Sequence, residues 1–116
     1  MTVWSDGLVR SERGDDVEQL RATAVAVVQA VGDLVVRMRA AGPGHVDTKS
    51  SITDVVTAAD TAAEQLARRL LAQWRPGEPV LGEEEGGAGP PAGDLCWVVD
   101  PIDGTVNYLY GLPWYA

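Results

Sequence analysis

The chain has 116 residues, which is enough for one domain with a hydrophobic core and too few for two. Its 46% of hydrophobic and 22% of charged residues are typical of a globular protein rather than a disordered one. The net charge of −8 argues against a nucleic acid or an anionic membrane as a direct partner, because both are bound through lysine and arginine. An acidic protein can still bind a phosphorylated ligand where divalent cations reverse the local charge.

The start of the chain lacks the basic region and apolar core of a signal peptide. No apolar stretch approaches the roughly 18 residues needed to span a membrane, so we expect a cytoplasmic protein without membrane contact. Cys96 is the only cysteine and cannot form an internal disulfide. It lies within an apolar run, which predicts a buried and reduced thiol.

Residues 1–14 are polar and rich in turn formers, which predicts a flexible lead-in. A long helix is predicted next, capped by Asp15 or Asp16 and ended by Gly42-Pro43-Gly44. Its apolar residues recur at intervals of three and four, the spacing of one helical face: Val17, Leu20, Ala24, Val27, Val28, Val31, Leu34, Val35 and Met38. We expect this segment to be a core helix.

A second helix is predicted to begin between Thr57 and Asp60 and to end at Arg75-Pro76-Gly77. The side chains expected to face inward from it are Ala62, Leu66, Leu70 and Trp74.

Two short strands are predicted at 79–81 and 95–99, joined through a Gly/Pro/Ala-rich surface loop at 86–93. The second strand is continuously apolar, as expected when both faces of a sheet are covered. The run 108–116 is aromatic-rich and has no polar finish, which is typical of the start of a buried strand. We therefore expect an α/β fold with helices packed on a sheet, in a chain that is the first part of a longer one.

The run Asp100-Pro101-Ile102-Asp103-Gly104-Thr105 carries the strongest chemical signal. It places two carboxylates at the end of a buried strand, with a proline that rigidifies the turn and a glycine that lets backbone approach a ligand. Such oxygen ligands suit Mg²⁺, which prefers carboxylates, substrate phosphate and retained waters. The alternative is a plain acidic turn. A calcium EF-hand is excluded, because Pro101 and Ile102 break its alternating ligand positions.

The run Gly82-Glu83-Glu84-Glu85 follows one predicted strand as Asp100 follows the other. Consecutive glutamates are usually a solvated face. If the two strand ends are neighbours, however, carboxylates lie a few ångströms apart and repel by about 4 kcal/mol at an effective dielectric near 20. A bound cation would offset that repulsion.

The third acidic element is the segment 49–60, in which Asp54 and Asp60 taken alone indicate a turn residue and a helix cap. The sequence contains no Cys/His cluster for zinc, no Walker-type loop and no serine nucleophile elbow.

In this order, the segments 49–60, 81–84 and 97–108 resemble the inositol monophosphatase family, and in particular its bacterial inositol-1-monophosphatases. The resemblance covers residues 16–116, about the first half of a typical member. It implies a layered αβαβα sandwich of the inositol monophosphatase/fructose-1,6-bisphosphatase type. Residues 15–116 would be the amino-terminal part of a phosphatase domain. The carboxy-terminal half, with a further metal-binding aspartate and the substrate-recognition residues, has no counterpart in this sequence.

The resemblance also implies a set of metal ligands. Glu83, Asp100 and the backbone carbonyl of Ile102 would hold one Mg²⁺, and Asp100 and Asp103 would hold a second. Glu84 would support this site or add a further metal contact.

The catalytic and substrate-binding residues follow from the same resemblance. Thr105, hydrogen-bonded to Asp60, would act with Glu83 to orient and deprotonate the attacking water. The substrate phosphate would contact Glu83, Asp103, Gly104 and Thr105, with Gly104 and Thr105 acting partly through their backbone amides.

The implied activity is Mg²⁺-dependent hydrolysis of a small phosphomonoester, with inositol-1-phosphate giving inositol and phosphate. Histidinol-phosphate, 3′-phosphoadenosine nucleotide and fructose-1,6-bisphosphate remain alternative substrates. Lys49 would come from a flexible segment near the site. The family implies a homodimer for a full-length protein. An alternative of another class is an inactive metal-binding or dimerising fragment, and we expect the isolated chain to have no measurable phosphatase activity.

Overall fold

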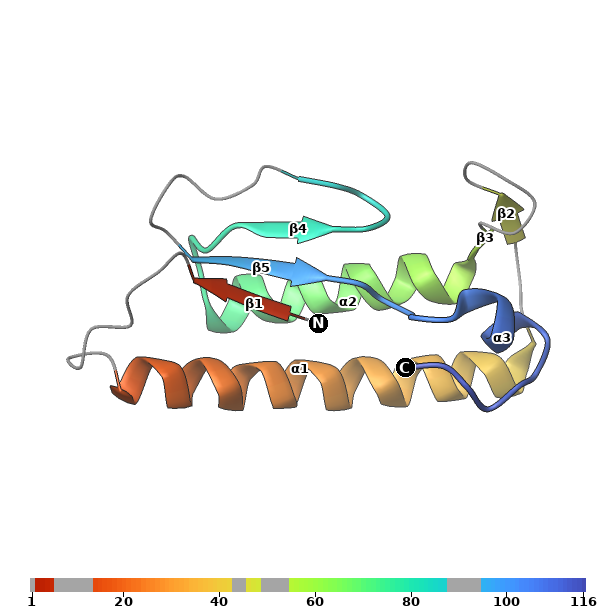
Figure 1. The fold of residues 1–116 in the computed structure, drawn as a ribbon, viewed down its shortest axis with the longest axis horizontal. Helices are drawn as coiled ribbons and strands as arrows, with labels where there is room; N and C mark the ends of the chain where they lie inside the picture. Colours follow the sequence, from red (N-terminus) through yellow and green to blue (C-terminus); the bar gives the residue numbers. More distant parts are fainter. Residues whose placement is uncertain (1, 6–13, 43–45, 49–54, 88–94) are drawn as a thin grey trace.

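The computed structural model describes residues 2–5, 14–42, 46–48, 55–87 and 95–116, in which two long helices lie against a small mixed sheet (Figure 1). In chain order the elements are β1 (Thr2–Ser5), α1 (Gly14–Ala41), β2 (Val46–Thr48), β3 (Val55–Thr57), α2 (Ala58–Trp74), β4 (Val80–Gly82), β5 (Leu95–Val99) and α3 (Thr105–Leu109). The three-stranded sheet has the order β1-β5-β4, and β2 pairs separately with β3. The chain therefore has the predicted α/β character, with α1 and α2 running in opposite directions.

The central strand β5 pairs in parallel with β4 and antiparallel with β1. Its continuous apolar sequence is matched by burial of Cys96, Trp97 and Val99, and Cys96 is a free, buried thiol as predicted. The strand β1 corrects the expectation of a wholly flexible lead-in. Its residues pair with β5, which lies some ninety positions away, so no local pattern in the sequence indicated it.

The core is divided into two clusters along α1. Val27 packs with Ala67 and Leu71 of α2 and with Trp97 and Val99 of β5. Further along the helix, a second cluster joins Val35, Ala59, Ala63, Ile102 and Tyr108. Both predicted helices therefore form, and each contributes to both clusters.

The buried face of α2 lies one residue further along than the sequence predicted. Ala63, Ala67 and Leu71 are fully buried, whereas Trp74 is 43% exposed and Leu70 is only partly buried. The prediction selected the largest apolar side chains. The structure instead turns small alanines inward, which lets α2 pack closely on α1 and leaves room for buried polar groups on the same face.

The carboxy-terminal run also differs from the expected buried strand. Residues 105–109 form the short helix α3, which begins after Gly104 and is followed by Gly111, both with positive φ. Tyr108 is buried, but Tyr110 is 74% exposed and Trp114 is 77% exposed. The two glycines let the chain turn, so the aromatic run is divided between core and surface.

Over Val17–Ala41, α1 is long and apolar enough, by length and composition alone, to cross a membrane. This corrects the expectation that no segment approaches that length. Asp33 is the only charged residue between Arg21 and Arg37, and the small and polar residues there do not interrupt the helix. Core helices pass the same test. Val27 and Val35 are buried in the two clusters, so one face of α1 contributes to the core. Other apolar residues of the helix, including Val28 and Val36, are exposed.

A polar group joins the end of α2 to the sheet. The buried indole of Trp97 donates from Nε1 to the carboxylate of Glu78 at 2.7 Å, and Arg75 donates from Nε to the same carboxylate at 2.9 Å. Burial alone would raise the pKa of Glu78, but the hydrogen bonds from Arg75 and Trp97 and the charge of Arg75 outweigh it and lower the pKa.

We expect Glu78→Ala to lower the free energy of unfolding by about 1–3 kcal/mol near neutral pH, because the indole N–H loses its acceptor. A lowered folded-state pKa stabilises the fold above the unfolded value, near 4.5, and this contribution is lost as the pH falls through the folded pKa. Urea denaturation at pH 7 and at pH 3 should therefore show a smaller difference at pH 3. Glu18→Ala, in an exposed ion pair with Arg21, is the control. A Glu78→Ala difference that is independent of pH would contradict this role.

Candidate active site

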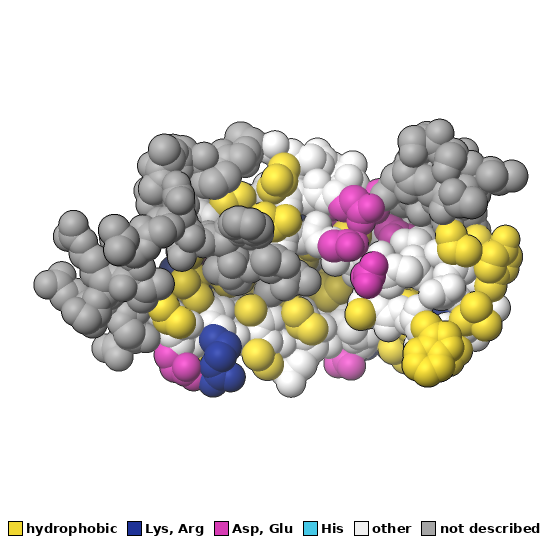
Figure 2. All heavy atoms as spheres, in the orientation of Figure 1, with side chains coloured by type: hydrophobic (Ala, Val, Ile, Leu, Met, Phe, Trp, Pro, Cys, Tyr) yellow, Lys and Arg dark blue, Asp and Glu magenta, His cyan; other side chains and the backbone are white. Residues whose placement is uncertain are grey.

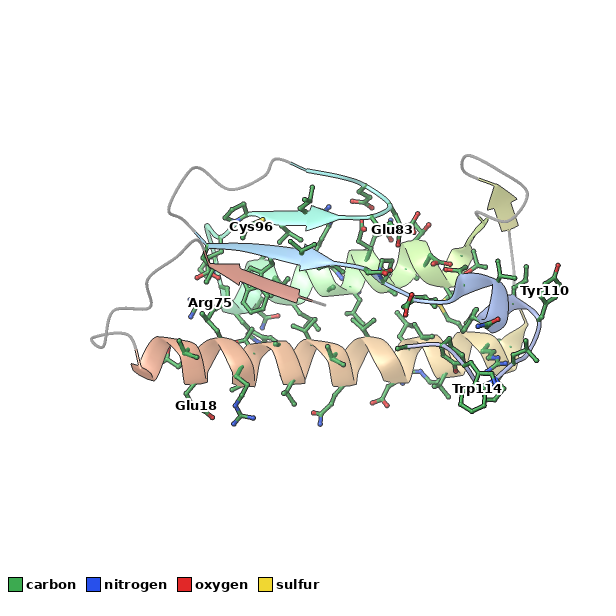
Figure 3. The ribbon with its side chains drawn as sticks, viewed as in Figure 1. Glu18, Arg75, Glu83, Cys96, Tyr110 and Trp114 are labelled. Carbon is green, nitrogen blue, oxygen red and sulfur yellow. The ribbon has the colours of Figure 1, made fainter. Side chains whose placement is uncertain are left out.

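The parallel register of β4 and β5 brings two acidic strand ends together. Gly82 lies opposite Val99, and the backbone N–H of Glu83 donates to the carbonyl of Val99 at 3.1 Å. Glu83 and Asp100 are the next residues on the two strands and lie side by side. Figure 2 shows acidic side chains gathered on one face beyond the tips of β4 and β5, and Figure 3 labels Glu83 at that edge.

Asp100 has a perturbed pKa because of this crowding. Burial, a hydrogen bond with Glu83 and the negative charges of Glu83 and Asp103 together raise the pKa of Asp100 to about 6. The carboxyl groups of Glu83 and Asp100 are thus close enough for the charge of Glu83 to disfavour ionisation of Asp100. Asp103 acts on Asp100 through its charge.

The donor set suits a hard divalent cation, because it consists of carboxylate oxygens. Among the residues that the structure describes, however, no group of three or more His, Cys, Asp or Glu side chains is arranged to hold a metal ion. The carbonyl oxygen of Ile102 lies 3.1 Å from the Thr105 hydroxyl oxygen, within hydrogen-bond distance. The donor chemistry therefore fits the predicted cation. Of the predicted ligands, Glu83 and Asp100 are in contact, but the described residues do not surround a metal position.

The predicted contact between Thr105 and Asp60 is present. The Thr105 hydroxyl donates to Oδ1 of Asp60 at 2.9 Å, across 45 residues of sequence. The other oxygen, Oδ2, accepts from the backbone N–H and the hydroxyl of Thr57 at 2.9 and 2.6 Å. This capping box at the start of α2 leaves Asp60 fully buried and fixes the direction of the oxygen that faces Thr105.

Gly104 is required by geometry at the start of α3. Its φ of +80° is a left-handed conformation, and a Cβ there would lie 3.0 Å from the carbonyl oxygen of Trp114. Beside it, the backbone of Asp103 pairs with Ala116, with N···O distances of 2.7 and 3.1 Å. The loop that carries the predicted phosphate-binding residues is therefore held by the end of the chain.

Glu64, which was not among the predicted site residues, lies one helical turn after Asp60 and is fully buried. Its two carboxylate oxygens accept the backbone N–H groups of Glu84 and Glu85, at 2.8 and 2.7 Å. The sequence did contain an indication of its position. Asp60, Glu64 and Arg68 are spaced four residues apart, which places all three charged side chains on one face of α2. Lys49 and Asp54 lie outside the described residues.

Asp100 and Asp103 also line a hollow of about 530 Å³ between α1 and the last residues of the chain. Its other walls are mostly apolar and include Val28 and Val36, which are largely exposed. Asp100 and Asp103 therefore border a mostly apolar hollow.

We expect Glu83→Gln to lower the pKa of Asp100 below about 6, because a neutral partner removes the charge repulsion. Carboxyl ¹³C chemical shifts, followed through a pH titration without divalent cations, would measure this. Asp33→Asn, an equal loss of charge at an exposed position on α1, should leave the midpoint unchanged. An Asp100 midpoint that is the same in the Glu83→Gln variant would show that the two groups are not in contact.

Comparison with known proteins gives one consistent result. A sequence model of the inositol monophosphatase family matches residues 16–116. The chain is 50% identical over 105 residues to the inositol-1-monophosphatase SuhB of Mycobacterium tuberculosis, covering 85% of this chain and 36% of that protein. It is 51% identical over 71 residues to a histidinol-phosphatase of Streptomyces coelicolor, covering 61% of this chain and 26% of that protein.

Solved structures agree. The extragenic suppressor protein SuhB of Bartonella henselae superposes with a TM-score of 0.76 at 30% identity, over 84% of this chain and 38% of that one. An IMPase/NADP phosphatase complexed with Mg²⁺ and phosphate superposes with a TM-score of 0.59 at 25% identity, over 83% and 35%. This chain thus spans between 26% and 38% of the length of these relatives. From its sequence and its fold, the chain belongs to the inositol monophosphatase family.

Proposed function

We propose that this chain provides the first carboxylate group and the water-orienting threonine of a Mg²⁺-dependent phosphomonoesterase. The observation that carries the proposal is the contact of Glu83 with Asp100 at neighbouring strand ends, in a chain of a phosphatase family. A relative of known structure that binds Mg²⁺ together with phosphate supports the choice of metal. The ligands in this chain would be Glu83, Asp100, Asp103 and the carbonyl of Ile102.

Magnesium bound there would neutralise the charge of the substrate phosphate and activate water as a Lewis acid. The chain's own residues would position that water. Because the Thr105 hydroxyl donates its hydrogen to Asp60, the lone pairs of its oxygen are available to accept a hydrogen bond from water. Glu83 would accept the proton that the water loses, and the Asp103–Thr105 loop would hold the phosphate.

Inositol-1-phosphate is the proposed substrate, because the relatives that cover most of this chain are inositol-1-monophosphatases. Histidinol-phosphate is the second candidate, since histidinol-phosphatases match at similar identity over a shorter stretch. The residues that separate the two substrates would lie in the two thirds of the relatives that this chain does not span.

A chimera tests the proposal, with residues 16–116 replacing the matching part of M. tuberculosis SuhB. We expect it to release phosphate from inositol-1-phosphate only with Mg²⁺. Asp100→Asn should lower turnover by at least about a hundredfold, because the metal site then lacks the carboxylate that neighbours Glu83. Asp33→Asn, the control, should leave turnover unchanged. Full activity in excess EDTA would contradict the mechanism. A folded, Mg²⁺-binding chimera without turnover would instead favour a metal-binding module that is not an enzyme.

A second prediction concerns Asp60. In Asp60→Asn, the amide oxygen can keep the bonds from Thr57, so the amide nitrogen faces Thr105. The Thr105 hydroxyl must then donate to Ile102 and accept from the amide, which occupies one of the two lone pairs that were available to the water. We expect turnover of the chimera to fall by about 10²-fold or more, with stability reduced by only about 1 kcal/mol.

Thr105→Val should match Asp60→Asn in turnover, whereas Thr105→Ser keeps the hydroxyl and should remain within about tenfold of the unsubstituted chimera. Steady-state kinetics and thermal unfolding of the three variants provide the comparison. Near-normal turnover in Thr105→Val would remove the threonine from the mechanism.

A further inference from the structure

We propose that Glu64 is a positioning residue, which fixes the direction of Glu83 by holding the turn that follows β4. The inference deepens the proposed function and rests on it for the role of Glu83. Glu64 lies on α2, outside the set of residues that the family resemblance assigns to the site. The turn is visible at the tip of β4, where Glu83 is labelled above α2 (Figure 3).

Three consecutive backbone N–H groups of this turn have acceptors from two different elements. The N–H of Glu83 donates to Val99 on β5 at 3.1 Å. Those of Glu84 and Glu85 donate to Oε1 and Oε2 of Glu64, at 2.8 and 2.7 Å. The peptide groups on both sides of the Glu83 Cα are thereby fixed, so its side chain leaves the backbone in one direction.

The chemistry of the turn explains why a buried charge is present. The two N–H donors point at two different oxygens of one side chain, and only a carboxylate provides two acceptor oxygens. Glutamine would provide one acceptor and would direct its own N–H₂ at the second donor. Arg68 lies beside the carboxylate, with its Nε 3.4 Å from Oε2, and donates to the carbonyl of Gly86. Arg68, on the same helix, therefore places a positive charge beside the Glu64 carboxylate.

Gly82 shows that the space for Glu64 is tightly defined. A Cβ on Gly82 would lie 2.2 Å from Oε1 of Glu64 and 2.7 Å from Nη2 of Arg68. The same glycine closes the turn through reciprocal backbone bonds with Gly86, at 2.9 and 3.1 Å. A larger residue at position 82 would displace the carboxylate from the amides that it holds.

Glu64→Gln in the 116-residue chain, with Glu18→Gln as a matched exposed control, tests the proposal. Amide hydrogen exchange, followed by ¹H–¹⁵N NMR, should accelerate at Glu84 and Glu85 by about tenfold or more, while amides in the α1 core remain protected. In a titration with MgCl₂ alone, the dissociation constant should rise by about tenfold. Glu18→Gln should change neither quantity.

Gly82→Ala provides a test that keeps the carboxylate. It should reproduce both effects, and combining it with Glu64→Ala should add little, because the displaced group is then absent. Unchanged exchange at Glu84 and Glu85 in Glu64→Gln would overturn the proposal. Faster exchange with unchanged Mg²⁺ affinity would also overturn it, because Glu64 would then only support the fold. If neither the 116-residue chain nor the chimera binds Mg²⁺ while the two amides respond, the proposed function fails and the hold of Glu64 on the turn stands.

Discussion

Two carboxyl groups are brought into contact in this protein because β4 and β5 pair in parallel with Gly82 opposite Val99. Strands that run in the same direction end at the same edge of a sheet, so the residues that follow them become neighbours. A shift of the register by one residue would move Glu83 away from Asp100 and turn every side chain of β4 to the other face. The hydrogen bond from Glu83 to Val99 continues the ladder to the last position before the acidic pair and sets the geometry of the edge.

The helix α2 supports both loops that leave this edge. Asp60 and Glu64 lie one turn apart on its buried face, and each directs a carboxylate at a different segment. Asp60 holds the hydroxyl of Thr105 after β5, and Glu64 holds the backbone after β4. Burying two carboxylates is costly unless each is fully hydrogen-bonded. Here each accepts three bonds or more, and among the described residues no buried side-chain oxygen or nitrogen lacks a partner. One rigid element therefore couples the positions of the two loops.

Much of this arrangement follows from the sequence, and the failures have a common cause. The span of β5 was predicted because a continuous apolar run depends only on its own residues. The inward face of α2 was assigned to residues such as Trp74, although Leu71 and its neighbouring alanines occupy it, since side-chain size does not reveal how closely two helices approach. The contact of Thr105 with Asp60 was expected only from the family resemblance. Glu64 was missed because a buried glutamate and a solvated one look the same in the sequence. Only the fold shows that backbone N–H donors point at this carboxylate.

The crowding of carboxylates also decides which ligands the edge can bind. Glu83, Asp100 and Asp103 would together repel a phosphate group, so under the proposed function a cation must bind before or with the substrate. The proton that Asp100 keeps up to about pH 6 occupies the same oxygens as that cation. Metal binding must then release a proton and weaken as the pH falls below that value. Under the same proposal, Glu64 holds the turn after β4 whether a proton or a cation is bound. The two then compete at Asp100 through charge, so the occupancy of this edge by a cation depends on pH.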